Sequence, residues 1–355
     1  MPQKNNPNPL ICQTTPWDNN SNPIWLASSV VLQRNIEKFK FPGKLDVDCK
    51  KQIIALISKK LLASEMLSKP ALIKAEELDA LEKEWLVEHF LCNHSYHQAG
   101  AGEAFIMDES GAFLASLNLF DHLHLQLVDH QGELENTWNR LVKIESALGK
   151  GLNYAFSPNF GFLTADPTLC GTALIVSVYL QLPGLIHTNQ LDDILEKTVD
   201  ESFLVTGVQG DPEEIFGDVI RIQNNYTLGI TEENIISSLR SVVTKLIVEE
   251  NNARKKIAKE ESAEIKDRIS RAYGILIHSY QIEAIEALNA LSLLKLAADV
   301  HWLKGIDHQQ LNQLFFNCRR AHLSCQSSEK ISQEELPHKC AEMIHKSLKD
   351  VKLII

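Results

Sequence analysis

Short strand-like runs alternate with helical runs from residue 24 to 224, and after Gly229 the pattern is helical only. The segment 104–117 consists of two apolar runs around a polar turn, which predicts a β-hairpin. Residues 123–128 alternate between apolar and polar, as in a strand with one polar face. Hairpins mixed with helices predict an α+β domain on a mainly antiparallel sheet.

The spacing of apolar residues predicts the remaining elements. Further strands are expected at 24–32, 160–164, 202–206 and 219–224, and the last three are expected to lie in the main sheet. Helices are expected at 46–67, 75–91, 135–148, 231–247, 282–300, 309–316 and 333–353. The charged stretch 249–271 is expected to be a solvated helix. We predict a flexible leader over 1–23, an α+β domain over 24–250 and a helical domain over 251–355.

Charge and cysteine content exclude several classes of function. The 355 residues include 35 basic and 46 acidic side chains, a formal net charge of -11, which argues against binding nucleic acid or an anionic membrane surface. The start of the chain has no signal-peptide pattern, and apolar runs are too short to span a membrane. Seven scattered cysteines without a CxxC pair are typical of reduced cytosolic thiols. We therefore expect a cytoplasmic protein.

Two groups of histidines could bind a ligand. His89, Cys92, His94 and His97 offer zinc-type ligands, but no second segment completes a tetrahedron, so a helix end with a polar loop is favoured. His122 and His124 share one face of a predicted strand and could bind a metal or a phosphate, although a polar sheet face is favoured. No metal site is predicted, and P-loop, GxGxxG and HExxH motifs are absent.

Five blocks of sequence resemble, in the same order, the ATP:guanido phosphotransferases, also called the phosphagen kinase family. The clearest is NFGFLTADPTLCGTALIVSVYLQLP at 159–183, which is similar to the family's GYLTxCPTNxGTGLRASVxxHLP. The others lie at 25–35, 118–126, 206–211 and 271–276, and the resemblance is strongest to the bacterial branch that phosphorylates protein arginine. It implies a glutamine-synthetase-type antiparallel sheet domain and an all-helical C-terminal domain that forms a homodimer.

The chemistry implied by this resemblance requires several charges. The γ-phosphoryl group of ATP passes to an arginine guanidinium, and arginines and Mg²⁺ stabilise the negative charge of the transition state. Carboxylates orient the guanidinium and accept its proton, and a nearby cysteine helps to position it.

This sequence departs from the family at each of those positions. Ser29, Val31, His124, Ile175 and Thr206 stand where arginines belong, Leu119 and Phe120 replace two glutamates, and Asp166 replaces the cysteine. The positions equivalent to the nucleotide site are Ala27, Ser28, Ser29, Val30, Val31, His89, His124, Ile175, Val176, Ser177, Val178, Tyr179, Thr206, Gly207, Val208, Gln209, Gly210 and Asp211. The stretch 337–342 also lacks the arginines of a phosphoarginine-binding motif of the bacterial branch. Neither a catalytic residue nor a cofactor is therefore expected.

Three hypotheses follow. The first is a catalytically silent homologue that acts as a protein-binding scaffold in a stress-response or Clp-protease context. Its partner would be, by resemblance, the zinc-binding activator protein of the kinase or a Clp unfoldase. The second is an active phosphotransferase that uses ATP and Mg²⁺ at a rebuilt site containing Asp121, His122, His124 or Asp166. The third is a binding protein for an arginine-like small molecule, recognised by Asp166.

Overall fold

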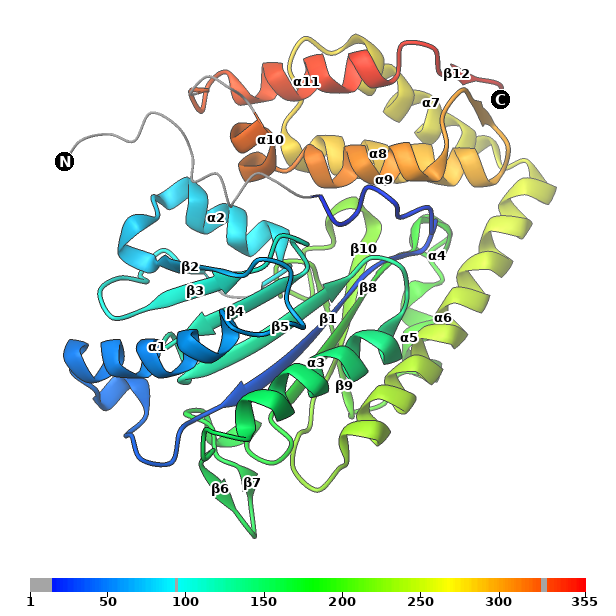
Figure 1. Cartoon of the computed structure of the whole chain (residues 1–355). Coiled ribbons are helices and arrows are strands. Elements are labelled where there is room, and N and C mark those ends of the chain that lie inside the picture. Colours follow the sequence, from blue (N-terminus) through cyan, green and yellow to red (C-terminus); the bar gives the residue numbers. More distant parts are fainter. Residues whose placement is uncertain (1–14, 93–94, 327–330) are drawn as a thin grey trace. The chain divides into compact units, whose positions relative to one another are not determined.

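The computed structural model describes residues 15–92, 95–326 and 331–355. Its largest element is an eight-stranded sheet with the order β2-β3-β4-β5-β1-β8-β10-β9 (Figure 1). The strands of this sheet are β1 (Trp25–Arg34), β2 (Ala71–Lys74), β3 (Ala104–Met107), β4 (Phe113–Leu117), β5 (Leu123–Asp129), β8 (Leu174–Gln181), β9 (Phe203–Gly207) and β10 (Val219–Asn224). Two-stranded sheets are formed by β6 (Phe156–Ser157) with β7 (Gly161–Phe162), and by β11 (Leu303–Lys304) with β12 (Lys352–Leu353).

Helices account for most of the remaining described residues. They are α1 (Val47–Leu61), α2 (Ala80–His89), α3 (Leu134–Gly149), α4 (Pro183–His187), α5 (Leu191–Thr198), α6 (Glu232–Glu260), α7 (Ala263–His278), α8 (Ala284–Asp299), α9 (His308–Asn317), α10 (Arg320–Gln326) and α11 (Leu336–Ser347). Four 3-10 turns are η1 (Pro42–Lys44), η2 (Ala75–Glu77), η3 (Pro167–Leu169) and η4 (Phe216–Asp218). No helix in this described part of the chain combines the length and the apolar character needed to cross a bilayer.

Contacts divide the chain into two compact units. Unit 1 comprises Met1–Pro16, Ser28–Ser177 and Gln223–Leu239, and unit 2 comprises Trp17–Ala27, Val178–Ile222 and Arg240–Ile355. The predicted boundary near residue 250 stays a prediction.

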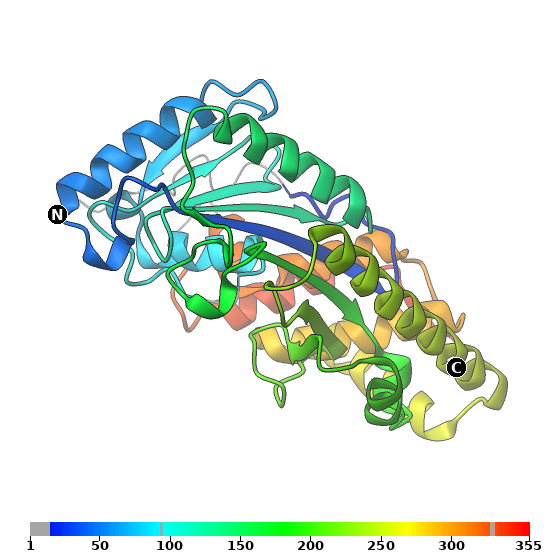
Figure 2. The same cartoon turned by 90° about the horizontal axis from the view of Figure 1, so that it is seen from below.

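The part of the sheet that belongs to unit 1 has one apolar face and one polar face. Strands β3, β4 and β5 form an antiparallel meander, and β5 pairs antiparallel with β1, so that Leu32 lies opposite Leu125. In Figures 1 and 2, α1 and α3 cover one face of β3–β5 and α2 lies on the other. Alternation places Leu32 and Leu125 on the face of α3, because Arg34, two residues further along β1, pairs with Glu145 of α3.

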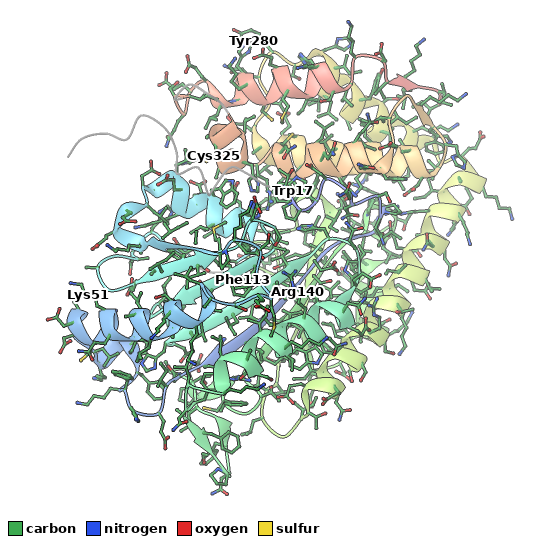
Figure 3. All side chains as sticks on the ribbon, in the orientation of Figure 1. Trp17, Lys51, Phe113, Arg140, Tyr280 and Cys325 are labelled. Carbon is green, nitrogen blue, oxygen red and sulfur yellow. The ribbon has the colours of Figure 1, made fainter. Side chains whose placement is uncertain are left out.

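The core of unit 1 is built from large side chains that these layers enclose. Phe90, Phe105 and Phe113 are fully buried. Figure 3 shows Phe113 inside the layers and Lys51 on the outer side of α1. Burial of this apolar area is the main stabilising contribution, at roughly 25 cal/mol per Å².

In unit 2 the helices α7 to α11 gather together (Figure 1). Glu250 of α6 accepts hydrogen bonds from the backbone N–H groups of Gly184 (2.8 Å) and Leu185 (2.9 Å), which begin α4. Arg254 donates Nε–H to the same carboxylate at 2.6 Å and also pairs with Asp299. A carboxylate at the positive end of a helix is favourable, and Arg254 neutralises it.

Lys295 of α8 is fully buried within unit 2. Its ammonium group donates hydrogen bonds to the side-chain oxygens of Gln181 and Asn312. Burial, together with the charge of Arg254, lowers the pKa of Lys295 well below its usual value. The lysine therefore joins the strand β8 to the helices α8 and α9 through amide acceptors.

The predicted leader includes residues with defined contacts. Residues 1–14 lie outside the described part of the chain. Within unit 2, Trp17 is fully buried and stacks on Phe316 at a centroid distance of 4.9 Å. Asn312 donates from its amide to the carbonyl of Asn20 at 2.9 Å. The leader is therefore packed into unit 2 from Trp17 onward.

The predicted hairpin at 104–117 and the strands at 123–128, 202–206 and 219–224 are confirmed as β3–β4, β5, β9 and β10. The prediction that 160–164 forms a strand of the main sheet is wrong. Only Gly161 and Phe162 are extended, and they pair with β6 in a separate hairpin. Gly161 has a φ of +68°, and a Cβ there would lie 2.4 Å from the carbonyl oxygen of Gly171, so the backbone turns instead of continuing.

Candidate functional site

The face of the unit 1 sheet toward α2 carries a set of buried polar side chains. In one row Gln33 lies opposite His124, and His124 lies opposite Ser116. In the next row Val31 lies opposite Gln126. Each of these polar side chains is buried and only His124 is ionisable. The resemblance places arginines on this face, at Ser29, Val31 and His124, so their charge is absent from it.

Hydrogen bonds inside unit 1 occupy several of these polar groups. The Gln126 side-chain amide donates to Ser29 Oγ and to the carbonyl of Phe90, both at 2.7 Å. The Cys92 thiol donates to Gln126 Oε1 at 3.5 Å. The Tyr96 and Ser116 hydroxyl oxygens lie 3.4 Å apart. The serine at the first arginine position is thus part of a neutral network between the sheet and the end of α2.

Asp121 lies in the turn that leads into β5, and it holds three segments together. Its Oδ1 accepts hydrogen bonds from Asn35 Nδ2 (2.6 Å) and from the backbone N–H of Ala165 (2.7 Å), and its Oδ2 lies 3.3 Å from His124 Nε2. Burial acts to raise the pKa of Asp121, but these donors outweigh it and lower the pKa below its usual value. An anionic Asp121 with these partners acts as a structural acceptor.

The ring of His122 is also bound on both sides. Its Nδ1 accepts from the backbone N–H of Ile36 at 2.9 Å, which assigns the proton to Nε2, and Nε2 donates to the carbonyl of Lys40 at 2.8 Å. Burial lowers the pKa of His122. The ring therefore stays neutral and fixes the loop that follows β1.

Leu119 and Phe120, at the two glutamate positions, lie in the turn between β4 and β5. The turn begins at Asn118, which has a φ of +61° and donates from its amide to the carbonyls of Lys50 and Gly102 at 2.9 and 3.0 Å. Phe120 is 45% exposed and stacks on His124 at a centroid distance of 5.8 Å. The turn thus presents an aromatic ring where a carboxylate would be needed.

Asp166, at the cysteine position, caps the 3-10 turn η3. Its Oδ1 accepts from the backbone N–H of Thr168 at 2.9 Å and from the Thr168 hydroxyl at 2.7 Å. This is the usual role of an aspartate at the start of a helical turn. Where the family has a thiol, this chain has a carboxylate that stabilises the local turn.

Apart from His89 of α2, the remaining positions of unit 1 equivalent to the nucleotide site are strand residues. Ser28 and Val30 are buried in β1, and Ile175 is half-buried in β8. Val176 N–H donates to Asn224 Oδ1 at 2.7 Å, and the Ser177 hydroxyl donates to Gln223 Oε1 at 3.1 Å. These contacts tie β8 to β10 and provide no positive charge.

The unit 2 positions are Ala27, Val178, Tyr179 and the loop 206–211. The first three are buried. In the loop, the Thr206 hydroxyl donates to the carbonyl of Gly207 at 3.0 Å, and Gly207 N–H donates to the carbonyl of Asp211 at 2.7 Å. A Cβ on Gly207 would lie 1.9 Å from the Glu214 carbonyl oxygen, so the closed loop requires glycine there.

One residue beside this loop was missed by the sequence analysis. Arg221 of β10 is buried, and its Nη2 lies 4.0 Å from the position that a Cβ on Gly210 would take. The available signal was a single arginine within the otherwise apolar run 219–222.

Of the possible zinc ligands, the described residues His89, Cys92 and His97 do not form a metal-binding group. His89 Nε2 donates to the carbonyl of Gly111 at 2.7 Å, and its ring stacks on Trp85 at 4.0 Å. Burial raises the pKa of the Cys92 thiol to about 12, which disfavours the thiolate that zinc requires. His94 lies outside the described residues. Across 15–92, 95–326 and 331–355, no three acidic, cysteine or histidine side chains could together hold a metal.

In the stretch 337–342, Lys339 pairs with Glu342 at 2.8 Å on the exposed side of α11. His338 Nδ1 donates to the carbonyl of Tyr280 at 3.0 Å, and the two rings lie 4.5 Å apart. Tyr280 is strongly exposed and projects from the helical part of unit 2 (Figure 3).

Comparison with known proteins defines the class of this fold. The sequence pattern of the ATP:guanido phosphotransferase C-terminal catalytic domain matches residues 52–253. Among solved structures, a lombricine kinase superposes with a TM-score of 0.56 at 20% identity, over 69% of this chain and 71% of that one. A duplicated taurocyamine kinase from Schistosoma mansoni superposes with a TM-score of 0.58 at 21% identity, over 77% of this chain and 39% of that one. The chain belongs to the ATP:guanido phosphotransferase family.

Its similarity extends to one branch of the family. Residues 262–353 match the pattern of the protein-arginine kinase McsB C-terminal domain. The protein-arginine kinase of Chlamydia pneumoniae is 35% identical over 317 residues, which cover 88% of this chain and 87% of that protein. The protein-arginine kinase of Halothermothrix orenii is 34% identical over 323 residues, which cover 90% and 92%.

Proposed function

We propose that this chain is a catalytically silent homologue of the protein-arginine kinases that acts as a protein-binding scaffold or regulator. One observation carries the proposal. At the positions where the family's chemistry requires charge, this chain has uncharged side chains or groups bound into its own hydrogen bonds. Ser29 accepts from Gln126, and Asp166 caps Thr168. The fold is retained, while the groups that would act on ATP and a guanidinium are absent.

The missing arginines make tight nucleotide binding unfavourable. A triphosphate needs several positive partners as it leaves water, and a valine or an isoleucine offers none, at a cost of several kcal/mol. At these five positions only His124 is ionisable, and it already lies against Asp121. Apart from Arg221 beside the loop 206–211, Mg²⁺ would have to neutralise the phosphates.

The missing carboxylates leave the second requirement of the reaction, activation of the guanidinium group, unmet. A guanidinium carries its own positive charge, so an enzyme must orient it and accept a proton before its nitrogen can attack phosphorus. Leu119 and Phe120 can do neither. Asp121 is the nearest replacement, but its oxygens accept from Asn35 and Ala165 and its lowered pKa makes it a weak base.

The scaffold function is proposed from the family's associations and from exposed apolar side chains. By resemblance, the partner is the zinc-binding activator protein or a Clp unfoldase of the stress response, and the setting is cytoplasmic. Phe156 and Phe160 are 58% and 55% exposed on the β6–β7 hairpin, and Tyr280 is 74% exposed. Exposed aromatic residues are enriched at protein interfaces. A homodimer formed by the helical C-terminal domain belongs to the same proposal.

Calorimetric titration with Mg·ATP tests the silent scaffold. We expect an affinity of about 1 mM or weaker for the wild type, and no change in the variant Asp121→Ala, since Asp121 serves the structure. Micromolar binding would contradict the proposal.

A rebuilt active site is the second candidate, and the contact between Asp121 and His124 at 3.3 Å favours it. A carboxylate beside a histidine is a common arrangement for proton transfer. In that case ATP and Mg²⁺ are the cofactors, and phosphoarginine formed by the wild type should disappear in Asp121→Ala or Asp166→Ala. Thermal melts of both variants separate loss of activity from loss of folding.

A further inference from the structure

Among the residues that the structure describes, the buried guanidinium group of Arg221 in unit 2 has no partner. The residue is 5% exposed, and its Nε is a buried polar atom without a hydrogen bond. Among the described residues, no ion pair or hydrogen bond to this side chain is found. A buried charge without a counter-charge costs several kcal/mol, so it is normally paired. An anionic ligand would supply the missing partner.

The end of the side chain lies beside the loop 206–211. The strands β9 and β10 are neighbours in the sheet, and the loop 206–211 begins with the last two residues of β9. Arg221 Nη2 lies 4.0 Å from the position of a Cβ on Gly210, which has no side chain and a φ of +97°. Glycine in this left-handed conformation leaves the backbone accessible next to the guanidinium. The two features together form one side of a small site.

The charges around the loop limit the kind of anion. A guanidinium presents parallel N–H groups that match two oxygens of a phosphate or a carboxylate. Asp211 at the end of the loop and Glu213 and Glu214 just after it are exposed, and Asp211 Oδ1 accepts from the backbone N–H of Glu213 at 2.8 Å. These acids repel a ligand with many negative charges. A phosphate monoester offers three acceptor oxygens where a carboxylate offers two, which favours phosphate as the partner of the guanidinium group.

We propose that Arg221 and the loop 206–211 bind a single phosphate group, either free or as a monoester. The arginine of this site comes from β10, whereas Thr206 stands at the loop position where the resemblance places an arginine. The proposal does not depend on catalytic silence, because a phosphate held by one arginine is bound without being transferred. A phosphate titration and a kinase assay can therefore fail independently.

Calorimetry on the full chain at constant pH and ionic strength tests the site. The probes are inorganic phosphate and phosphoserine, with acetate as the carboxylate control. At least one phosphate probe should bind the wild type with a millimolar dissociation constant, and Arg221→Gln should weaken it about tenfold or more. Arg221→Lys, which keeps the charge but loses the fork, should lie between the two. Arg271→Gln is the matched control, because Arg271 is exposed on α7 and pairs with Asp267 at 2.8 Å.

Three results would overturn the proposal. The first is that Arg221→Gln binds phosphate as tightly as the wild type. The second is that acetate binds as tightly as phosphate, and the third is that neither phosphate probe binds. Thermal unfolding without phosphate tests whether Arg221 instead stabilises the fold. Removal of an unpaired buried charge should leave the melting temperature of Arg221→Gln equal or higher. A fall of more than about 5 °C, or failure to fold, would show that the arginine is a structural element.

Discussion

Gln126 is a neutral side chain on the sheet face where the resemblance places charged residues. Its amide donates to Ser29 and to the carbonyl of Phe90, so a neutral group satisfies its neighbours. Each such hydrogen bond contributes about 1 kcal/mol to stability, and breaking it leaves a buried polar atom. The residues at this face therefore stabilise the fold.

Restoring one family arginine should not restore activity. In Ile175→Arg the new charge would lack the other four arginines, both glutamates and the thiol, and groups that act as a unit give no partial gain. We expect no phosphoarginine on an unfolded substrate protein, measured by mass spectrometry. Detectable turnover by this single variant would mean that the other positions still supply the chemistry.

Lys295 provides a test of the buried network in unit 2. Lys295→Met keeps the shape of the side chain but leaves the acceptors on Gln181 and Asn312 without their donor. We expect the free energy of unfolding to fall by about 2 kcal/mol in urea denaturation. Lys256→Met, on the exposed side of α6, should change it by less than about 0.5 kcal/mol. Equal effects in the two variants would refute the structural role of Lys295.

At the scale of elements, α2 depends on its first residue. Asp79 accepts from the backbone N–H of Glu82, and the Glu82 side chain accepts from Asp79 N–H, both at 2.9 Å, which completes a capping box. Asp79→Ala should destabilise the protein by about 1 kcal/mol and increase amide exchange in α2. Glu76→Ala removes an exposed carboxylate just before the helix and serves as the control. Unchanged exchange in Asp79→Ala would contradict the importance of the cap.

Strands with clear alternation and tight turns were predictable from the sequence. The hairpin β3–β4 and the strand β5 follow directly from apolar spacing and the turn at Gly111. The strand β2 was not predicted, because four residues carry too little pattern. Residues 160–164 looked like a main-sheet strand, yet the positive φ of Gly161 turns the chain. Backbone conformation of this kind depends on tertiary packing.

The candidate site was predictable only in part. Resemblance located Leu119, Phe120 and Asp166 as positions of the family's site, since they lie in ordered blocks of sequence, but it did not predict the turn or the cap that they form. The contacts of Asp121 with Asn35 and Ala165 join segments far apart in the chain, so spacing could not show them. The same is true of Arg221 beside Gly210.

At the scale of the whole molecule, stability should decrease in mild acid. Burial, followed by the charges of Lys295 and Arg254, lowers the pKa of His308 to about 4, whereas the unfolded chain protonates near about 6.5. Between these values the unfolded state binds more protons, so stability is complete above about pH 6.5 and is lost as the pH falls toward 4. Burial also lowers the pKa of His122, which adds in the same direction.

Thermal melts between pH 7.5 and about pH 4.5 measure this dependence. The melting temperature of the wild type should fall across this range, and His308→Gln should show a shallower fall. His97→Gln, which changes an exposed histidine in unit 1, should follow the wild type. The same slope in His308→Gln and the wild type would assign the acid sensitivity to other groups.

Catalytic silence is tested most directly by incubating the purified chain with Mg·ATP and an unfolded substrate protein. Phosphoarginine is then quantified by mass spectrometry, with a protein-arginine kinase that retains the family's arginines, glutamates and cysteine as the positive control. We expect no phosphoarginine above the level without enzyme, because the eight charged or nucleophilic positions of the family are replaced here. Phosphoarginine that rises with time and with enzyme concentration, and that is absent in Asp121→Ala, would contradict the silent scaffold and support the rebuilt active site.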